Sequence, residues 1–123
     1  MRIGMLSWES LYSIKVGGIA PHVSEISEAL AKEGHEIHVF TRRGEFDLYD
    51  CINGVNYQRV NSDSTGGLIY QMDSMCDALY NRFLAAQKIF GKFDLLNGHD
   101  WHPVPALIRL KDEKTGQGRQ RED

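Results

Sequence analysis

Short apolar runs alternate along this chain with longer segments in which apolar residues recur every three or four positions. A run of five to seven residues is typical of a buried parallel strand, and the three-to-four spacing is typical of a helix with one face on a core. The runs predict strands at 2–6, 35–41, 55–60 and 93–97. The spacing predicts helices from 19 to the glycine at 34, from 68 to 90, and again over 103–110.

Strand, helix and strand follow one another within the first 41 residues, which is the βαβ unit of a parallel sheet. The predicted fold class is therefore α/β, a Rossmann-like doubly wound parallel sheet with strand order 3-2-1-4. The polar stretch 42–50 is expected to be a loop, and Asn53-Gly54 a turn into the third strand. Residues 1–111 are expected to form one domain, and the polar residues 112–123 a disordered tail.

Composition narrows the possible partners. The chain carries 14 Lys and Arg against 17 Asp and Glu, a net charge of -3, so neither nucleic acid nor an anionic membrane is expected as a partner. No apolar run reaches the roughly 18 residues of a membrane span, and the start of the chain does not have the pattern of a signal peptide. Cys51 and Cys76 lack metal-site spacing and are expected to be free thiols, which favours a cytoplasmic location.

The topology itself predicts where a ligand would bind. In open parallel sheets, ligands bind outside the carboxyl ends of the strands, where the strand order reverses. With the order 3-2-1-4 this point lies between the first and fourth strands. The loops at 7–18 and 98–102 then meet there, and Trp8 and Glu9 become plausible cleft residues.

The first of these loops contains Lys15, Gly17 and Gly18 and leads into a helix. Glycines allow close backbone approach, the helix N-terminus offers free N–H groups, and lysine adds a positive charge for phosphate. A flexible loop with a solvated lysine is the alternative. The stretch is neither a Walker loop nor a GxGxxG motif.

The second loop contains more polar side chains that could bind a ligand, in the sequence His99, Asp100, Trp101 and His102. Two imidazoles and a carboxylate can hydrogen-bond sugar hydroxyls or act as acid–base groups. Equally, Trp101 could be core and the histidines polar groups satisfied near a loop. A metal site is not expected, because no other Cys or His lies at a fitting spacing.

Three further histidines lie outside these loops. His22 falls in the first turn of the first helix, facing the same cleft, and is a candidate hydrogen-bond partner for a ligand. His35 and His38 are interpreted as polar positions flanking a buried strand.

Three segments together resemble the N-terminal domain of GT-B glycosyltransferases, most closely the glycogen and starch synthases. They are MRIGMLSWES, KVGGIAPHVSEISEALAKEGHEIHVFTR and FDLLNGHDWHPVPALI. The Lys-x-Gly-Gly stretch looks like the KxGGL motif of those synthases, with Ile19 in place of leucine, and the HDWH tetrad follows in the matching order. The resemblance covers residues 1–111.

The resemblance implies a retaining hexosyltransferase that moves glucose from ADP- or UDP-glucose, as co-substrate, to an α-glucan acceptor without a metal or other cofactor. Lys15 would approach the donor phosphates, and Gly17 and Gly18 would bring backbone N–H groups to them. His102 would lie beside the transferred sugar, with Asp100 and His99 shaping the wall of the site around it, and His102 and Asp100 would be the catalytic residues.

The family pattern continues beyond residue 111 into the rest of this domain and a second domain, which residues 112–123 do not resemble. The chain is therefore expected to be an incomplete N-terminal, acceptor-side domain that needs a C-terminal GT-B domain or a split partner chain for activity.

Two alternatives remain open: a non-catalytic carbohydrate-binding module and a Rossmann-like nucleotide binder of other function. The absence of GxGxxG, and of an acidic residue at the end of the second strand where Thr41 and Arg42 stand, argues against a dinucleotide.

Overall fold

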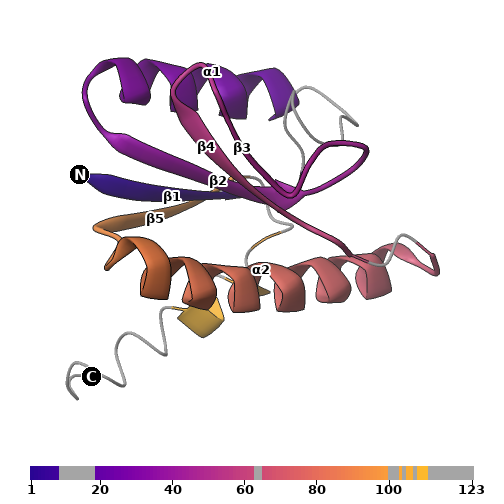
Figure 1. Ribbon diagram of the computed structural model, residues 1–123. Coiled ribbons are helices and arrows are strands. Elements are labelled where there is room, and N and C mark those ends of the chain that lie inside the picture. Colours follow the sequence, from indigo (N-terminus) through magenta and orange to yellow (C-terminus); the bar gives the residue numbers. More distant parts are fainter. Residues whose placement is uncertain (9–18, 63–64, 100–102, 104, 107, 111–123) are drawn as a thin grey trace.

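A computed structural model describes residues 1–8, 19–62, 65–99, 103, 105–106 and 108–110 of the chain (Figure 1). The elements in chain order are β1 (Arg2–Ser7), α1 (Ile19–Lys32), β2 (Glu36–Arg42), β3 (Tyr49–Ile52), β4 (Val55–Val60), α2 (Leu68–Phe90) and β5 (Leu95–His99). Residues 105–106 and 108–110 are helical, as their spacing predicts. The predicted tail at 112–123 lies outside the described residues.

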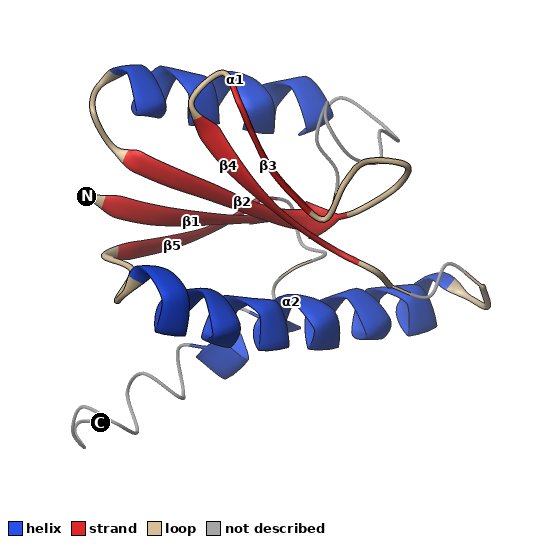
Figure 2. Ribbon diagram, viewed as in Figure 1, coloured by secondary structure: helices blue, strands red, loops and turns tan. Residues whose placement is uncertain are grey.

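The strands form one five-stranded sheet in the order β3-β4-β2-β1-β5. All neighbouring pairs are parallel except β3 and β4, which are antiparallel. Figure 2 shows α1 on one face of the sheet and α2 on the other. The predicted doubly wound α/β architecture is thus confirmed, with β4, β2, β1 and β5 in the predicted order. No helix in the described ranges is long and apolar enough to cross a membrane.

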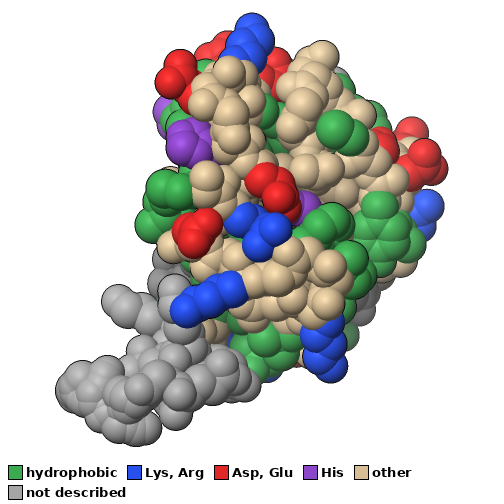
Figure 3. All heavy atoms as spheres, turned by 60° about the vertical axis from the view of Figure 1, so that its left-hand side comes forward, with side chains coloured by type: hydrophobic (Ala, Val, Ile, Leu, Met, Phe, Trp, Pro, Cys, Tyr) green, Lys and Arg blue, Asp and Glu red, His purple; other side chains and the backbone are tan. Residues whose placement is uncertain are grey.

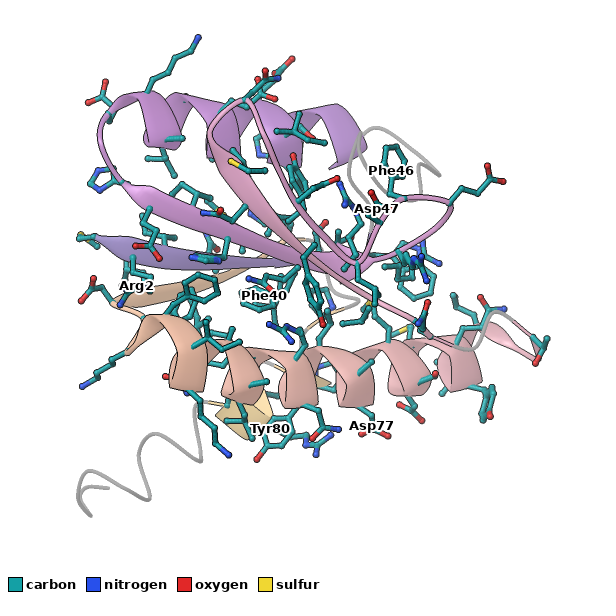
Figure 4. All side chains as sticks on the ribbon, viewed as in Figure 1. Arg2, Phe40, Phe46, Asp47, Asp77 and Tyr80 are labelled. Atoms are coloured by element: carbon teal, nitrogen blue, oxygen red, sulfur yellow. The ribbon has the colours of Figure 1, made fainter. Side chains whose placement is uncertain are left out.

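Each face of the sheet has its own apolar core because successive side chains on a strand point to opposite faces. Ile3 and Met5 of β1 face α1, whereas Leu6 belongs to the core under α2. The α1-side core comprises Ile3, Met5, Val23, Ile37, Val39, Val55 and Tyr57. The α2-side core is larger and includes Phe40, which lies between the sheet and α2 in Figure 4, with its ring 5.4 Å from that of Phe83.

Both long helices end where the sequence predicts. α2 runs from Leu68 to Phe90 and is followed by Gly91 at φ +97°. α1 ends at Lys32, and Gly34 also has φ +97°. A left-handed residue after the last turn is the usual end of a helix, and glycine adopts it without a Cβ clash.

The last strand differs from its prediction. It was expected at 93–97, but β5 spans Leu95–His99. Phe93 is buried under α2, and Asp94 bonds β1 instead: its carboxylate accepts from the Arg2 backbone N–H at 2.7 Å, and its own N–H donates to the Arg2 carbonyl at 2.8 Å. The shift brings His99, predicted to be in a loop, into the sheet.

One strand, β3, was not predicted from the sequence. Residues 49–50 fall in the segment predicted to be a loop, yet Tyr49–Ile52 pairs with β4. Asn53 at φ 52° and Gly54 at φ 83° form the tight turn between them, as two-residue hairpins require. The strand is only four residues long and mostly exposed, so it leaves little hydrophobic pattern.

Candidate functional site

The carboxyl ends of β1 and β5 lie side by side. The two strands are parallel neighbours, and Ser7 is the register partner of His99. Helix α1 begins at this same edge of the sheet, as Figure 1 shows. The segments after β1 and after β5 therefore leave the sheet next to each other, as the predicted strand order requires.

Two of the predicted site residues, His22 and His99, come together at this edge. Their ring centroids are 6.1 Å apart and the rings are nearly perpendicular, at 71°. His22 is exposed near the start of α1, whereas His99 is buried at the end of β5. The His22 imidazole is thus exposed to solvent, next to the buried imidazole of His99 on the sheet.

A hydrogen bond to Met5 holds the ring of His99, and burial favours its neutral form. Its Nε2 lies 3.1 Å from Sδ of Met5, a distance at which the N–H donates to sulfur, and Nδ1 is then the acceptor nitrogen. Burial lowers the pKa of His99, and the charge interaction with His22 lowers it further. A neutral imidazole at neutral pH can hydrogen-bond a hydroxyl group, but it adds no positive charge for a phosphate.

The other predicted site residues lie outside the described part of the chain. These are Lys15, Gly17, Gly18, Asp100 and His102, together with Glu9 and Trp101. What the structure describes is the frame around them, namely Ser7, His99 and the start of α1.

Trp8 was predicted as a cleft residue, and this is wrong. Its side chain is buried in the α2-side core, where it is grouped with Leu6 and Val60. The large indole finds apolar neighbours there, so burial outweighs exposure in a cleft.

Arg42, the last residue of β2, was not among the predicted site residues. Its guanidinium lies 3.5 Å from the centroid of the Trp8 ring, and its Nε donates to the Trp8 carbonyl at 2.7 Å. The side chain is only 7% exposed. Arg42 thus fixes the point at which the chain leaves β1. An arginine directly after an apolar strand was the signal available in the sequence.

The prediction that His38 flanks a buried strand is also wrong. His38 lies in the middle of β2, paired with Gly4 of β1, and is fully buried. His35 precedes β2 at the opposite end of the sheet, with Nδ1 3.3 Å from the N-terminal amino group. Neither histidine is at the carboxyl edge.

Comparisons with known proteins agree with this architecture. Residues 16–117 match the model of Glycosyltransferase Family 4. An uncharacterized glycosyltransferase of Methanocaldococcus jannaschii is 34% identical over 113 residues, which cover 89% of this chain and 28% of the relative. The sucrose-phosphate synthase of Thermosynechococcus elongatus is similar in structure, with a TM-score of 0.74 at 17% identity.

The structural match covers 91% of this chain and 30% of the synthase, so the chain spans less than a third of the length of either protein. The fold is that of a Rossmann-like domain of the GT-B type. Because the family match extends over most of the sequence, the chain belongs to Glycosyltransferase Family 4.

Proposed function

We propose that this chain is the acceptor-side part of a retaining glycosyltransferase of the glycogen or starch synthase type. The reaction would move glucose from ADP- or UDP-glucose to the end of an α-glucan. Family membership supports the reaction class. The pairing of Ser7 with His99 supports the location of the site, because β1 and β5 end next to each other there.

Each candidate residue has a role in this proposal. The bond between the anomeric carbon and the donor phosphate oxygen breaks, the acceptor oxygen bonds to that carbon and gives its proton to the departing phosphate, and the nucleoside diphosphate leaves. Lys15 and the N–H groups of Gly17 and Gly18, just before α1, would stabilise the charge on the departing phosphate. Positioning and charge stabilisation are enough for such a transfer, so no metal or other cofactor is included.

The segment after β5 would contact the transferred sugar. His102 would lie beside the transferred glucose, and Asp100 would bond its hydroxyl groups. His99 and His22 would line the wall, His99 as the neutral hydrogen-bonding group that burial makes it.

The donor nucleotide is assigned to a second domain. The relatives are more than three times as long as the segment matched here. Residues 1–123 alone are therefore expected to show no turnover.

The test supplies the missing part. Residues 1–111 are fused to the part of the archaeal relative that lies beyond its match with this chain, and the folding of the fusion is checked by circular dichroism. Nucleoside diphosphate release and glucan elongation are then measured with ADP- and UDP-glucose. We expect turnover by the fusion and none by the isolated chain. Lys15→Ala should reduce turnover about 100-fold, as for loss of a charge-stabilising group, whereas His35→Gln should not.

Robust transfer by residues 1–123 alone would overturn the two-domain proposal. A folded fusion that binds glucan but turns over neither donor would point instead to a non-catalytic carbohydrate-binding module.

A further inference from the structure

A buried histidine that takes no part in the proposed reaction lies at the centre of a side-chain network. The His38 side chain is 0% exposed. It is covered on the α2 side by Phe90 and Phe93, whose ring centroids lie 4.5 and 5.2 Å away. A titratable group enclosed in this way needs polar partners, because an unpaired buried imidazole would be costly.

Those partners form a continuous chain of hydrogen bonds. Arg82 Nε donates to Gln58 Oε1 at 3.0 Å. Gln58 Nε2 lies 3.2 Å from His38 Nδ1, and His38 Nε2 lies 2.7 Å from Glu36 Oε2. Arg2 Nε donates to the same Glu36 oxygen at 2.8 Å. We call these five residues the His38 network.

The two ends of the network fix the direction of every bond within it. A guanidinium can only donate, so Arg82 faces the Gln58 oxygen and turns the amide NH₂ toward His38. His38 Nδ1 must then accept. Nε2 carries the hydrogen and donates to the Glu36 carboxylate, which can only accept. The neutral Nε2–H tautomer is therefore the form of His38 that satisfies all of these bonds.

The network ties α2 and the connection from α2 to β5 to the rest of the sheet. Arg82 lies on α2 and also donates from Nη1 to the Tyr49 hydroxyl of β3 at 3.0 Å. Arg2 donates from Nη1 to the Lys92 carbonyl at 2.9 Å, in the connection from α2 to β5. Figure 4 shows Arg2 at the amino end of the sheet, beside the last turn of α2. Figure 3 turns this side forward and shows acidic and basic side chains next to one another.

Protonation of His38 breaks one bond of the network. Nδ1–H would face the Gln58 NH₂ group, so two donors would meet. Turning the amide over only moves the conflict, because its NH₂ would then face the Arg82 guanidinium. Among the described residues, the charged groups around His38 are Glu36 on β2, Arg2 on β1 and Arg82 on α2. β4 contributes the uncharged Gln58.

We propose that the His38 network is a pH-sensitive latch, which holds α2 and the α2–β5 connection on the sheet while His38 is neutral and loosens when it is protonated. The latch concerns the stability of this domain and is independent of the proposed glucosyl transfer.

The direction of the pH dependence follows from the environment of His38. Burial lowers its pKa, the hydrogen bond and charge of Glu36 oppose this shift, and the charges of Arg2 and Arg82 add to it. The unfolded chain binds the proton at about pH 6.5, before the folded chain does. The contribution of neutral His38 to the stability of the fold is therefore complete above about pH 6.5. It is lost as the pH falls toward the lower pKa that His38 has in the folded chain. Over that range the folding equilibrium changes by up to about tenfold per pH unit.

The first test is NMR of the wild-type chain with ¹⁵N-labelled histidine. The latch predicts the Nε2–H tautomer for His38 and a titration midpoint below that of an unperturbed histidine. In Gln58→Glu the carboxylate accepts from both Arg82 and His38 Nδ1–H, so the midpoint should move up by one pH unit or more. His35→Gln is the matched control, because it removes a histidine three residues away that is outside the network.

The second test locates the loosening. Amide hydrogen exchange, corrected for intrinsic rates, is compared at pH 7.5 and 5.5. α2 and residues 91–94 should lose protection in the wild type, and α1, which the network does not touch, serves as the internal reference. In His38→Gln this difference should disappear. His99 is also a buried histidine, and because it is present in both proteins its effect cancels.

An Nδ1–H tautomer, a midpoint at or above the ordinary value, or an unchanged midpoint in Gln58→Glu would overturn the proposal. Equal loss of protection in α1 and α2 would overturn it as well. Should Gln58→Glu fail to fold, the tautomer and midpoint of the wild type still decide.

Discussion

Removal of the Arg42 side chain is the sharpest test of how the end of β1 is held. Its guanidinium donates to the Trp8 carbonyl at 2.7 Å and stacks 3.5 Å from the indole centroid, in a place where only 7% of the residue is exposed. A hydrogen bond from a charged group contributes about 1.5–3 kcal/mol. A desolvated cation–π contact contributes about 1–2 kcal/mol. Since the two are coupled, Arg42→Ala should reduce the free energy of unfolding by about 2–4 kcal/mol.

Urea unfolding followed by far-UV circular dichroism measures this change. Arg42→Lys keeps a cation and a donor and should recover about half of the loss. Arg43→Ala is the matched control: its Nε donates to the Phe46 carbonyl at 2.6 Å, but the residue is only half-buried, and we expect a loss of about 1 kcal/mol. Arg42 does not hold the end of β1 in this way if Arg42→Ala costs no more than Arg43→Ala, or if Arg42→Lys is as damaging as Arg42→Ala.

Two further predictions concern buried charge and the candidate site. Arg59 is fully buried on β4 and pairs with Asp50 at 2.8 Å; because the Asp50 side chain is 31% exposed, Asp50→Asn should cost about 2–3 kcal/mol in urea unfolding, less than a fully buried pair. Asp77→Asn breaks an exposed pair with Arg109 and should cost less than about 1 kcal/mol, and an equal cost for both variants would contradict the role of burial. At the site, His22→Gln removes the charge interaction between His22 and His99 and should raise the pKa of His99 toward its ordinary value, while burial keeps it below. An NMR titration of His99 that is the same in both proteins would show that His22 does not act on it.

Helices and strands were predictable from the sequence where the spacing of apolar residues repeats over many positions. The helix at 68–90 was predicted with its bounds because the apolar spacing persists over six turns and ends at a glycine. β4 was predicted residue for residue. β3 was not, because a four-residue strand on the edge of a sheet owes its place to the turn at Asn53-Gly54 and to its neighbour rather than to its own pattern.

Only the part of the candidate site that depends on the strand order was predictable from the sequence. The strand-order rule placed the ends of β1 and β5 together, and the pairing of Ser7 with His99 confirms this. The burial of Trp8 and of His38 was not predictable, because each depends on a partner from another strand: Arg42 for Trp8, and Gln58 for His38. Side-chain contacts between neighbouring strands produce no periodic pattern in the sequence.

The most direct test of the central claim is an NMR titration of ¹⁵N-labelled chain with ADP-glucose and UDP-glucose. The second domain would supply most of the affinity, so binding in the millimolar range, about 4 kcal/mol, is expected. We expect shifts of the His22 and His99 signals and of the Gly17 and Gly18 amides, with His35 and His38 unchanged. Shifts confined to His35, at the opposite end of the sheet, or none with either donor, would contradict a sugar-nucleotide site between β1 and β5.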